Sequence, residues 1–404
     1  MQFSSVIGQQ KVKDQLLHMV NDNRLSHALL FLGGEGSGAL SMARALAQYT
    51  VCERVNGKTS QEAAGPSLFG DEPSPEENNE SLTDSCGTCA GCQKAAKMIH
   101  PDIHFSYPVF PRKSGDKAIS NDFITEWREF MAEDPYGNSY DWLQHIGAEN
   151  KQGNINVHEC NEIIRMMSLK SFESEYKILI MWMPEMLGKE GNKLLKLIEE
   201  PPPDSLFILV AENENLILPT ILSRTQLVRF PPLSGKEISQ ALQERESIAP
   251  ARAEQIAAIS DGNYHEALQH IAHADDDWEV LLRDWLNSIL KTGPVAQVKW
   301  IDEISKIGRE KQKQFLKYFT HLLSHAIRLR ALGDAALQME NQSATDFASR
   351  LNKLCDIAQQ EAIVHELDQA AYYIERNANA KMLFHALTIK IYHIISNKSV
   401  ILVQ

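Results

Sequence analysis

The strongest chemical signal in the sequence is a set of cysteines with metal-ligand spacing. Three stand within seven residues and a fourth stands upstream: Cys86, Cys89, Cys92 and Cys52. Four thiolates suit Zn²⁺, which prefers tetrahedral coordination by sulfur and nitrogen, and a site closed by four ligands is structural. The nearby His100 and His104 are alternative fourth ligands. A redox-active CxxC pair or free thiols are the alternatives to metal binding.

A second signal is a glycine-rich loop with the spacing of a phosphate-binding site. Gly33 and Gly38 fit the pattern G-x-x-x-x-G-K-[ST] directly after the apolar run 28–32. Ala39 and Leu40 replace the Lys and Ser/Thr that should follow. The sequence therefore lacks the ammonium that holds the β- and γ-phosphates and the hydroxyl that binds Mg²⁺. The loop backbone could still bind an anion weakly at a helix N-terminus.

The acidic residues that hold Mg²⁺ in an ATPase of this kind are missing as well. They would end the apolar run 178–183, but that run ends in Trp182 and Met183, with only Glu185 beyond it. Because both halves of the ATP site are absent, the loss of one function explains the pattern better than two unrelated sets of substitutions. The sequence predicts a nucleotide-binding fold that binds no ATP.

Ser223 and Arg224 follow a short helix that begins at Pro219. An arginine at the edge of an α/β nucleotide-binding fold is usually solvated or ion-paired. The more specific alternative is an arginine finger, which stabilises charge on a γ-phosphate bound by a neighbouring subunit. Spacing alone favours the first interpretation.

An α/β region over 1–232 must position these residues. Four apolar runs, at 28–32, 178–183, 206–210 and 227–230, alternate with helical patterns and predict a parallel sheet. Two insertions interrupt the region. The stretch 56–84 is acidic and rich in Pro, Gly and Ser, so we expect it to be mobile. The stretch at about 105–150 is rich in aromatic residues, so we expect it to fold.

The remainder of the chain is predicted to be helical. Ser234 and Glu237 form a capping box that begins the first helix of a small helical domain, 233–275. From 276 to 404 the apolar residues recur at helical spacing, as in Phe315, Phe319, Leu322 and Leu323. Cys160 and Cys355 are isolated and expected to be buried.

Length and composition limit the classes of function. A chain of 404 residues is long enough for two or three domains. The net charge of −13 argues against a protein that coats nucleic acid. The sequence shows no apolar run of membrane-spanning length and no secretory h-region near its start, so we expect a cytoplasmic protein without a membrane partner.

Several stretches together resemble the clamp-loader family of AAA+ ATPases, and within it the delta-prime branch of bacterial DNA polymerase III. They are VIGQQKVKDQL, RLSHALLFLGG, CGTCAGCQK, LLKLIEEPP and TILSR. The resemblance covers nearly all of 1–275. It implies a RecA-like α/β AAA+ domain (1–232) with a zinc module over about 52–92. An all-α lid domain (233–275) and an all-α collar domain for oligomerisation (276–404) follow.

The resemblance also implies a function. Clamp loaders are open five-subunit rings that use ATP to place a sliding clamp on primed DNA. The implied partners are the gamma/tau ATPase subunits and the delta subunit, within the DNA polymerase III holoenzyme. Delta-prime subunits lack a working ATP site, so no intrinsic ATPase activity is expected. Arg224 matches the family's arginine finger with Ser223 in support, although Thr225 replaces a Cys. His265 stands where ATPase subunits place a nucleotide-sensing Arg.

Two other functions fit the sequence less well. An active clamp-loader ATPase with an atypical loop would bind ATP as an isolated chain. A zinc-dependent nucleic-acid-binding protein would bind DNA with a strong dependence on salt, which the net charge of −13 disfavours.

Overall fold

The computed structural model describes residues 1–56, 83–113, 115–148, 151, 153–272, 278–332, 342–375 and 378–397. The chain divides into two units, Met1–Ile271 and Ala272–Gln404. The acidic stretch 56–84, expected to be mobile, lies almost entirely outside the described residues. The finer division into three domains stays a prediction.

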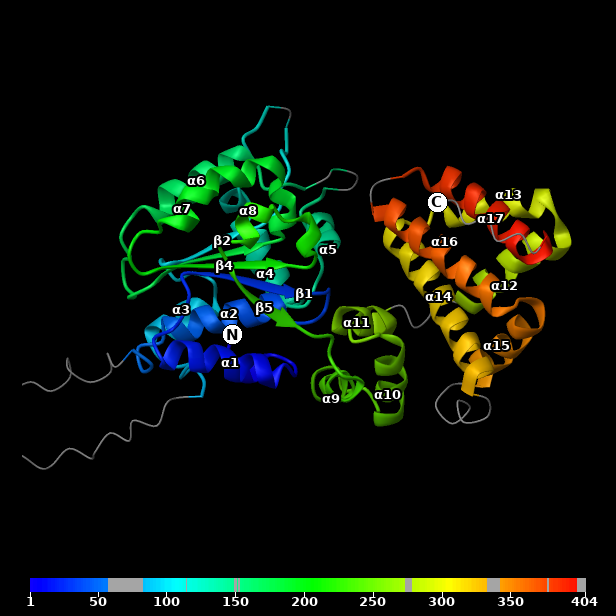
Figure 1. Cartoon of the computed structure of the whole chain (residues 1–404), viewed down its shortest axis with the longest axis horizontal. Helices are drawn as coiled ribbons and strands as arrows, with labels where there is room; N and C mark the ends of the chain where they lie inside the picture. Colours follow the sequence, from blue (N-terminus) through cyan, green and yellow to red (C-terminus); the bar gives the residue numbers. More distant parts are fainter. Residues whose placement is uncertain are drawn as a thin grey trace, which may run out of the picture. The chain divides into compact units, whose positions relative to one another are not determined.

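A parallel sheet of five strands forms the centre of the first unit (Figure 1). Four strands match the predicted apolar runs: β1 (Ala28–Gly33), β3 (Lys177–Trp182), β4 (Ser205–Ala211) and β5 (Gln226–Phe230). The edge strand β2 (Ile103–Ser106) is not predicted from the sequence. It is short and carries two polar residues. Phe105 and Ser106 belong to this strand, so the second insertion, predicted from about 105, begins after Ser106. The strand order is β2-β3-β4-β1-β5.

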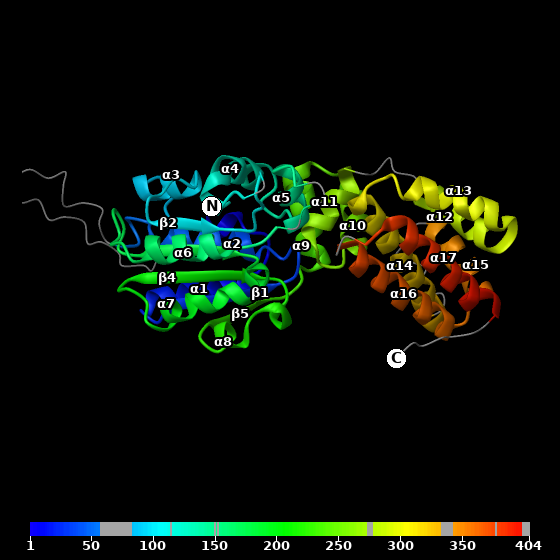
Figure 2. The ribbon, with the colours of Figure 1, turned by 90° about the horizontal axis from the view of Figure 1, so that it is seen from above.

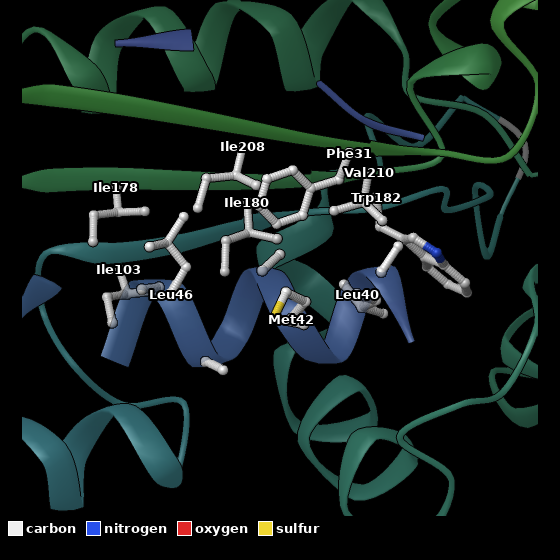
Figure 3. Packing of buried hydrophobic residues seen from close by; sticks show 14 of the residues in the cluster. Phe31, Leu40, Met42, Leu46, Ile103, Ile178, Ile180, Trp182, Ile208 and Val210 are labelled. Carbon is white, nitrogen blue, oxygen red and sulfur yellow. The ribbon is translucent and has the colours of Figure 1, made fainter. Parts of the chain in front are cut away.

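Helices cover both faces of the sheet (Figure 1), which explains why the strands are apolar throughout. On one face lie α1 (Gln10–Asn21) and α2 (Ala39–Thr50). Figure 3 shows Leu40, Met42 and Leu46 of α2 directed toward the sheet. The other face is covered by α6 (Val157–Met167), the 3₁₀ segment η3 (Pro184–Leu194), α7 (Leu195–Glu199) and α8 (Pro219–Leu222).

The aromatic-rich insertion is folded onto the α2 side of the sheet. It contains the 3₁₀ turn η2 (Ser120–Phe123), α4 (Ile124–Glu133) and α5 (Ser139–His145). The Trp127 ring lies at the centre of the aromatic packing of this insertion. Its centroid lies 4.1 Å from that of Tyr107 in a stacked pair, 5.1 Å from that of Trp142, and 5.4 Å from that of Trp182. The insertion is thus anchored to the end of β3 by aromatic packing.

Three helices complete the first unit: α9 (Gly235–Glu246), α10 (Pro250–Ile259) and α11 (Tyr264–Ala272), here called the lid helices. The predicted capping box is confirmed. The Glu237 N–H donates to Ser234 Oγ at 3.3 Å, and the Ser234 N–H donates to the Glu237 carboxylate at 2.7 Å. The lid core includes residues from outside these helices, among them Ile7 and Tyr136.

The second unit is a helical bundle (Figure 2). Its elements are α12 (Trp278–Asn287), the π-helix η5 (Ser288–Thr292), α13 (Pro294–Ile304), α14 (Arg309–Leu332), α15 (Gln342–Leu354), α16 (Ile357–Glu375) and α17 (Ala380–Asn397). The predicted apolar face of α14, from Phe315 to Leu323, is buried in its core. Trp285 and Trp300 stack there with centroids 4.7 Å apart. None of the described helices has the length and apolar character needed to cross a membrane.

Candidate functional site

The glycine loop joins β1, which lies between β4 and β5 in the sheet, to α2, the place where an α/β fold presents backbone N–H groups to a phosphate. Gly38 takes a left-handed conformation with φ of 86° and begins the helix. Ala39 and Leu40 are both buried, and Leu40 is part of the core between α2 and the sheet (Figure 3). The position that would offer a hydroxyl to Mg²⁺ therefore contributes apolar packing instead.

The end of β3 is also built for packing. Trp182 is 4% exposed and contacts the aromatic insertion. Met183 is buried, with a left-handed φ of 59°. Glu185 accepts hydrogen bonds from the backbone N–H groups of Glu212 and Asn213, at 2.6 and 2.8 Å. Burial raises the pKa of Glu185 above its ordinary value, and these hydrogen bonds offset only part of the rise. The carboxylate thus stabilises the turn after β4.

Residues 134–141 of the insertion, called here the covering segment, lie directly over the glycine loop. Ser41 Oγ donates to the carbonyl oxygen of Pro135 at 2.9 Å. A Cβ atom on Gly38 would lie 3.1 Å from the ring of Tyr136. The Tyr136 hydroxyl accepts a hydrogen bond from the Ile7 N–H at 2.8 Å. The segment is therefore packed against both the loop and the start of the chain.

Little space remains at the loop. Pro135, Tyr136, Gly137 and Trp182 reduce it to a cavity of about 30 Å³, room for a water molecule or two. Sites for nucleotide-sized ligands measure about 300–1,000 Å³. The residues described around this cavity include two carboxylates, Glu35 and Glu212, and no Lys or Arg. Both volume and charge oppose a bound triphosphate.

A wider hollow of about 480 Å³ opens beside the loop, at the carboxyl ends of β1, β4 and β5. Its charged side chains are Glu212, Glu214 and Arg229. Arg229 is already paired with Glu214 at 3.0 Å. Two carboxylates and one paired guanidinium leave net negative charge, which repels phosphate.

His265 lies at the junction of the lid helices and the covering segment, and its side chain is 2% exposed. Its Nδ1 is 3.3 Å from Asp134 Oδ2, and its Nε2 is 3.0 Å from Asp141 Oδ2. Glu35 of the glycine loop lies 3.8 Å from Nε2. Burial alone would lower the pKa of His265, but the neighbouring carboxylates of Asp134, Asp141 and Glu35 raise it from 6.5 to about 10. These carboxylates favour the protonated form of the ring, an imidazolium.

Arg224 lies at the surface just after α8. Its guanidinium pairs with the Glu199 carboxylate, and its Nη1 donates to the Thr220 carbonyl oxygen at 2.8 Å and to Ser223 Oγ at 3.0 Å. Thr225, in place of the family's Cys, donates to the Ile221 carbonyl oxygen at 3.2 Å. The guanidinium is thus held in one position while a third of the side chain stays exposed.

The four predicted cysteine ligands come together. The sulfurs of Cys52, Cys86, Cys89 and Cys92 all lie within 4.8 Å of one another, and those of Cys86 and Cys92 are 3.9 Å apart. Tetrahedral ligation with Zn–S bonds of about 2.3 Å requires sulfurs about 3.8 Å apart, so this set fits a zinc ion. N–H groups of Cys86, Cys89 and Cys92 point at neighbouring sulfurs at 3.3–3.4 Å.

The two histidines predicted as alternative fourth ligands lie outside the group of four sulfurs. His100 Nδ1 accepts a hydrogen bond from the Asp102 N–H at 3.1 Å. His104 lies on the edge strand β2. Among the described residues, neither belongs to the group of sulfurs. The remaining two cysteines, Cys160 and Cys355, are buried as expected.

The structure also identifies residues that the sequence analysis missed, namely Asp134, Tyr136 and Asp141. The segment DPYGNSYD contains turn-forming residues and two aromatic rings, but it matches no binding pattern. A signal would have required knowing that residue 136 contacts residue 7 and that residues 134 and 141 contact residue 265.

A parallel sheet of strand order β2-β3-β4-β1-β5, with a glycine loop after the interior strand β1 and helices on both faces, defines an α/β domain of the AAA+ class. The chain belongs to the family described as DNA polymerase III, delta subunit, which matches residues 8–67 and 73–234, more than half of the sequence. The resemblance predicted from the sequence is confirmed.

Individual relatives agree with this family. The chain is 26% identical over 263 residues to the DNA polymerase III subunit delta' of Bacillus subtilis, covering 65% of this chain and 58% of that protein. It is 25% identical over 319 residues to the tau subunit of the same organism, covering 76% and 44%. The chain thus spans about half the length of these curated relatives. A solved gamma subunit-related protein from Thermotoga maritima aligns over 94% of this chain and 98% of its own, at 14% identity and a TM-score of 0.36.

Proposed function

We infer that the chain is a clamp-loader subunit that binds no ATP itself and helps load a sliding clamp onto primed DNA. Its relatives include delta', tau and gamma/tau subunits of DNA polymerase III. The observation that carries the inference is the covering segment, which leaves about 30 Å³ over the glycine loop, while the hollow beside the loop carries net negative charge. The partners are gamma/tau ATPase subunits and a delta subunit, in the cytoplasm.

Calorimetry with MgATP and MgADP on the whole chain tests the absence of nucleotide binding. We expect no heat of binding at nucleotide concentrations up to the millimolar range. An ATPase subunit of the same complex is the positive control. Micromolar binding by this chain would overturn the inference and make it an active ATPase with an atypical loop.

Arg224 serves as an arginine finger for the ATP site of a neighbouring subunit, with Ser223 in support. Its guanidinium is held by Glu199 and the Thr220 carbonyl oxygen at the surface, which supports a preorganised charge. In the reconstituted complex, Arg224→Ala is expected to lower ATP turnover at the adjoining site by about 10³-fold or more, leaving the other sites active. Assembly should be unchanged.

Arg229→Ala is the matched control for that experiment, since Arg229 is an exposed, ion-paired arginine of the neighbouring strand β5. It should leave turnover intact. Equal rates for wild type and Arg224→Ala would exclude the finger role.

The four thiols hold one structural zinc ion that ties the chain after α2 to α3 (Ala90–Ala96). Elemental analysis is expected to find about one zinc per chain. Cys86→Ser should lose the metal, whereas Cys160→Ser, at a buried cysteine outside the group, should keep it. Full zinc content in Cys86→Ser would exclude this ligand set.

A further inference from the structure

The covering segment contacts the lid helices as well as the glycine loop. Tyr136 belongs to the lid core and meets Tyr264 edge-on, with ring centroids 5.0 Å apart. The Arg245 guanidinium of α9 lies 5.9 Å from the Tyr136 ring centroid. One aromatic side chain from the insertion is thus shared between the lid core and the start of the chain.

Charged side chains connect the covering segment with the lid helices and the glycine loop. His265 of α11 faces Asp134, at the end of α4, and Asp141, in α5, one through each ring nitrogen. Glu35 of the glycine loop lies on the Nε2 side, and Asn138 Nδ2 donates to that carboxylate at 3.2 Å. The cluster joins three separate pieces of the first unit: loop, insertion and lid.

The glycine loop also touches the lid directly. The Tyr264 N–H donates to the Gly36 carbonyl oxygen at 3.4 Å. Gly36 has a φ of 69°, and a Cβ atom there would lie 2.7 Å from the backbone nitrogen of Tyr264, so only glycine permits this approach. The glycine loop and the lid helices are therefore in direct contact, and the covering segment packs against both of them.

We propose that the covering segment is a built-in ligand that replaces a nucleotide, with the Tyr136 ring in the lid core and the Asp134 and Asp141 carboxylates pairing with His265. It holds the lid helices on the sheet domain with no bound cofactor. This inference rests on the proposed absence of ATP binding, and it explains how the lid is fixed without ATP.

A metal ion explains the cluster less well, although the ligand atoms of Asp134, Asp141 and His265 lie within 4.8 Å of one another. A metal would take one ring nitrogen as a neutral donor. Here both ring nitrogens face carboxylates, which suits an imidazolium with two N–H donors. One buried positive charge then offsets part of the negative charge of three carboxylates.

NMR titration of His265 in the unmodified protein is the first test. Its pKa, raised from 6.5 to about 10 by the carboxylates against the opposing effect of burial, predicts an imidazolium that stays protonated at pH 8. Titration near 6.5 would overturn the proposal. This measurement needs no variant and so does not depend on whether a substituted protein folds.

Hydrogen exchange of the lid helices is the second test. In Asp134→Asn/Asp141→Asn the amides of α9, α10 and α11 are expected to exchange about tenfold faster or more, because the partners that stabilise the charged ring are gone. Glu129→Gln/Glu133→Gln is the matched control, removing two exposed carboxylates from α4, the helix that ends just before Asp134. Unchanged lid exchange in the aspartate variant would overturn the proposal.

Two further measurements separate the competing explanations. If metal analysis of the wild type finds a second ion that disappears in the aspartate variant, the cluster is a metal site and the proposal fails. Calorimetry with MgATP on the wild type tests the proposed function by itself. If the wild type binds no ATP and the lid amides of the aspartate variant exchange at the wild-type rate, the built-in ligand is refuted. The proposed function is then still supported.

Discussion

Restoring the two missing loop residues is expected not to restore nucleotide binding. Ala39→Lys/Leu40→Thr recreates the G-x-x-x-x-G-K-T pattern, but Pro135 and Tyr136 stay over the loop, with about 30 Å³ beside them. A nucleotide needs roughly ten times that volume or more. We therefore expect a Kd for MgATP weaker than about 1 mM, corresponding to a binding free energy above about −4 kcal/mol.

The same change lowers stability by an amount set by the packing of Leu40, which is 7% exposed. Truncating a buried leucine costs about 2–5 kcal/mol, and a buried hydroxyl without a partner adds about 1–3 kcal/mol. Threonine keeps a methyl group, so we expect a loss of about 3–5 kcal/mol in the free energy of unfolding. That loss lies at or below the low end of the roughly 5–15 kcal/mol typical of folded proteins.

Calorimetry with MgATP and urea denaturation measure the two quantities on one preparation. Leu46→Thr is the matched control, because Leu46 is a buried leucine of the same helix α2, farther along it from the loop (Figure 3). It should lose similar stability and leave nucleotide binding unchanged. Micromolar binding by the double variant would refute the reasoning, since it would show that the covering segment leaves the site open.

Three further outcomes are expected. Trp182→Asp should lower the free energy of unfolding in urea by at least about 3 kcal/mol, because it removes aromatic packing and buries a carboxylate; a cost no greater than that of Trp182→Phe would contradict this. The midpoint temperature of thermal unfolding of the first unit should decrease as the pH is raised from 7 to 10. The stability from His265, at most about 5 kcal/mol, is complete below pH 6.5 and is lost as pH rises through the folded pKa of about 10. His265→Gln should flatten that fall, and an unchanged slope would count against it. A zinc chelator should destabilise the wild type but leave Cys86→Ser unaffected; equal losses would exclude zinc as the source.

The elements that bury apolar surface on both sides were predictable from the sequence. The runs at 28–32, 178–183, 206–210 and 227–230 became strands because a sheet covered on both faces needs apolar residues throughout. The capping box at Ser234 was predictable for the opposite reason, since its hydrogen bonds are local. Strand β2 was missed because four residues with His104 and Ser106 among them carry little pattern.

The candidate site was predictable only where its residues lie in local patterns. The loop, the end of β3 and the cysteine spacing are readable from the chain itself. The role of 134–141 is not, because its contacts reach Ile7 and His265, each more than a hundred residues away. The sequence identified the departure at His265 from the family's Arg but not the two aspartates that accompany it.

The tryptophans give each unit its own optical signal. Of the six, Trp127, Trp142 and Trp182 lie in the first unit, and Trp278, Trp285 and Trp300 lie in the second. The rings of Trp285 and Trp300 are stacked with nearly parallel planes, 4° apart, a geometry suited to exciton coupling in circular dichroism. Trp182 lies at the cavity of the glycine loop, and Trp127 packs against both Trp182 and Trp142, so the fluorescence of these three rings reports the state of the insertion. Unfolding of the two units can therefore be followed separately in the unlabelled chain.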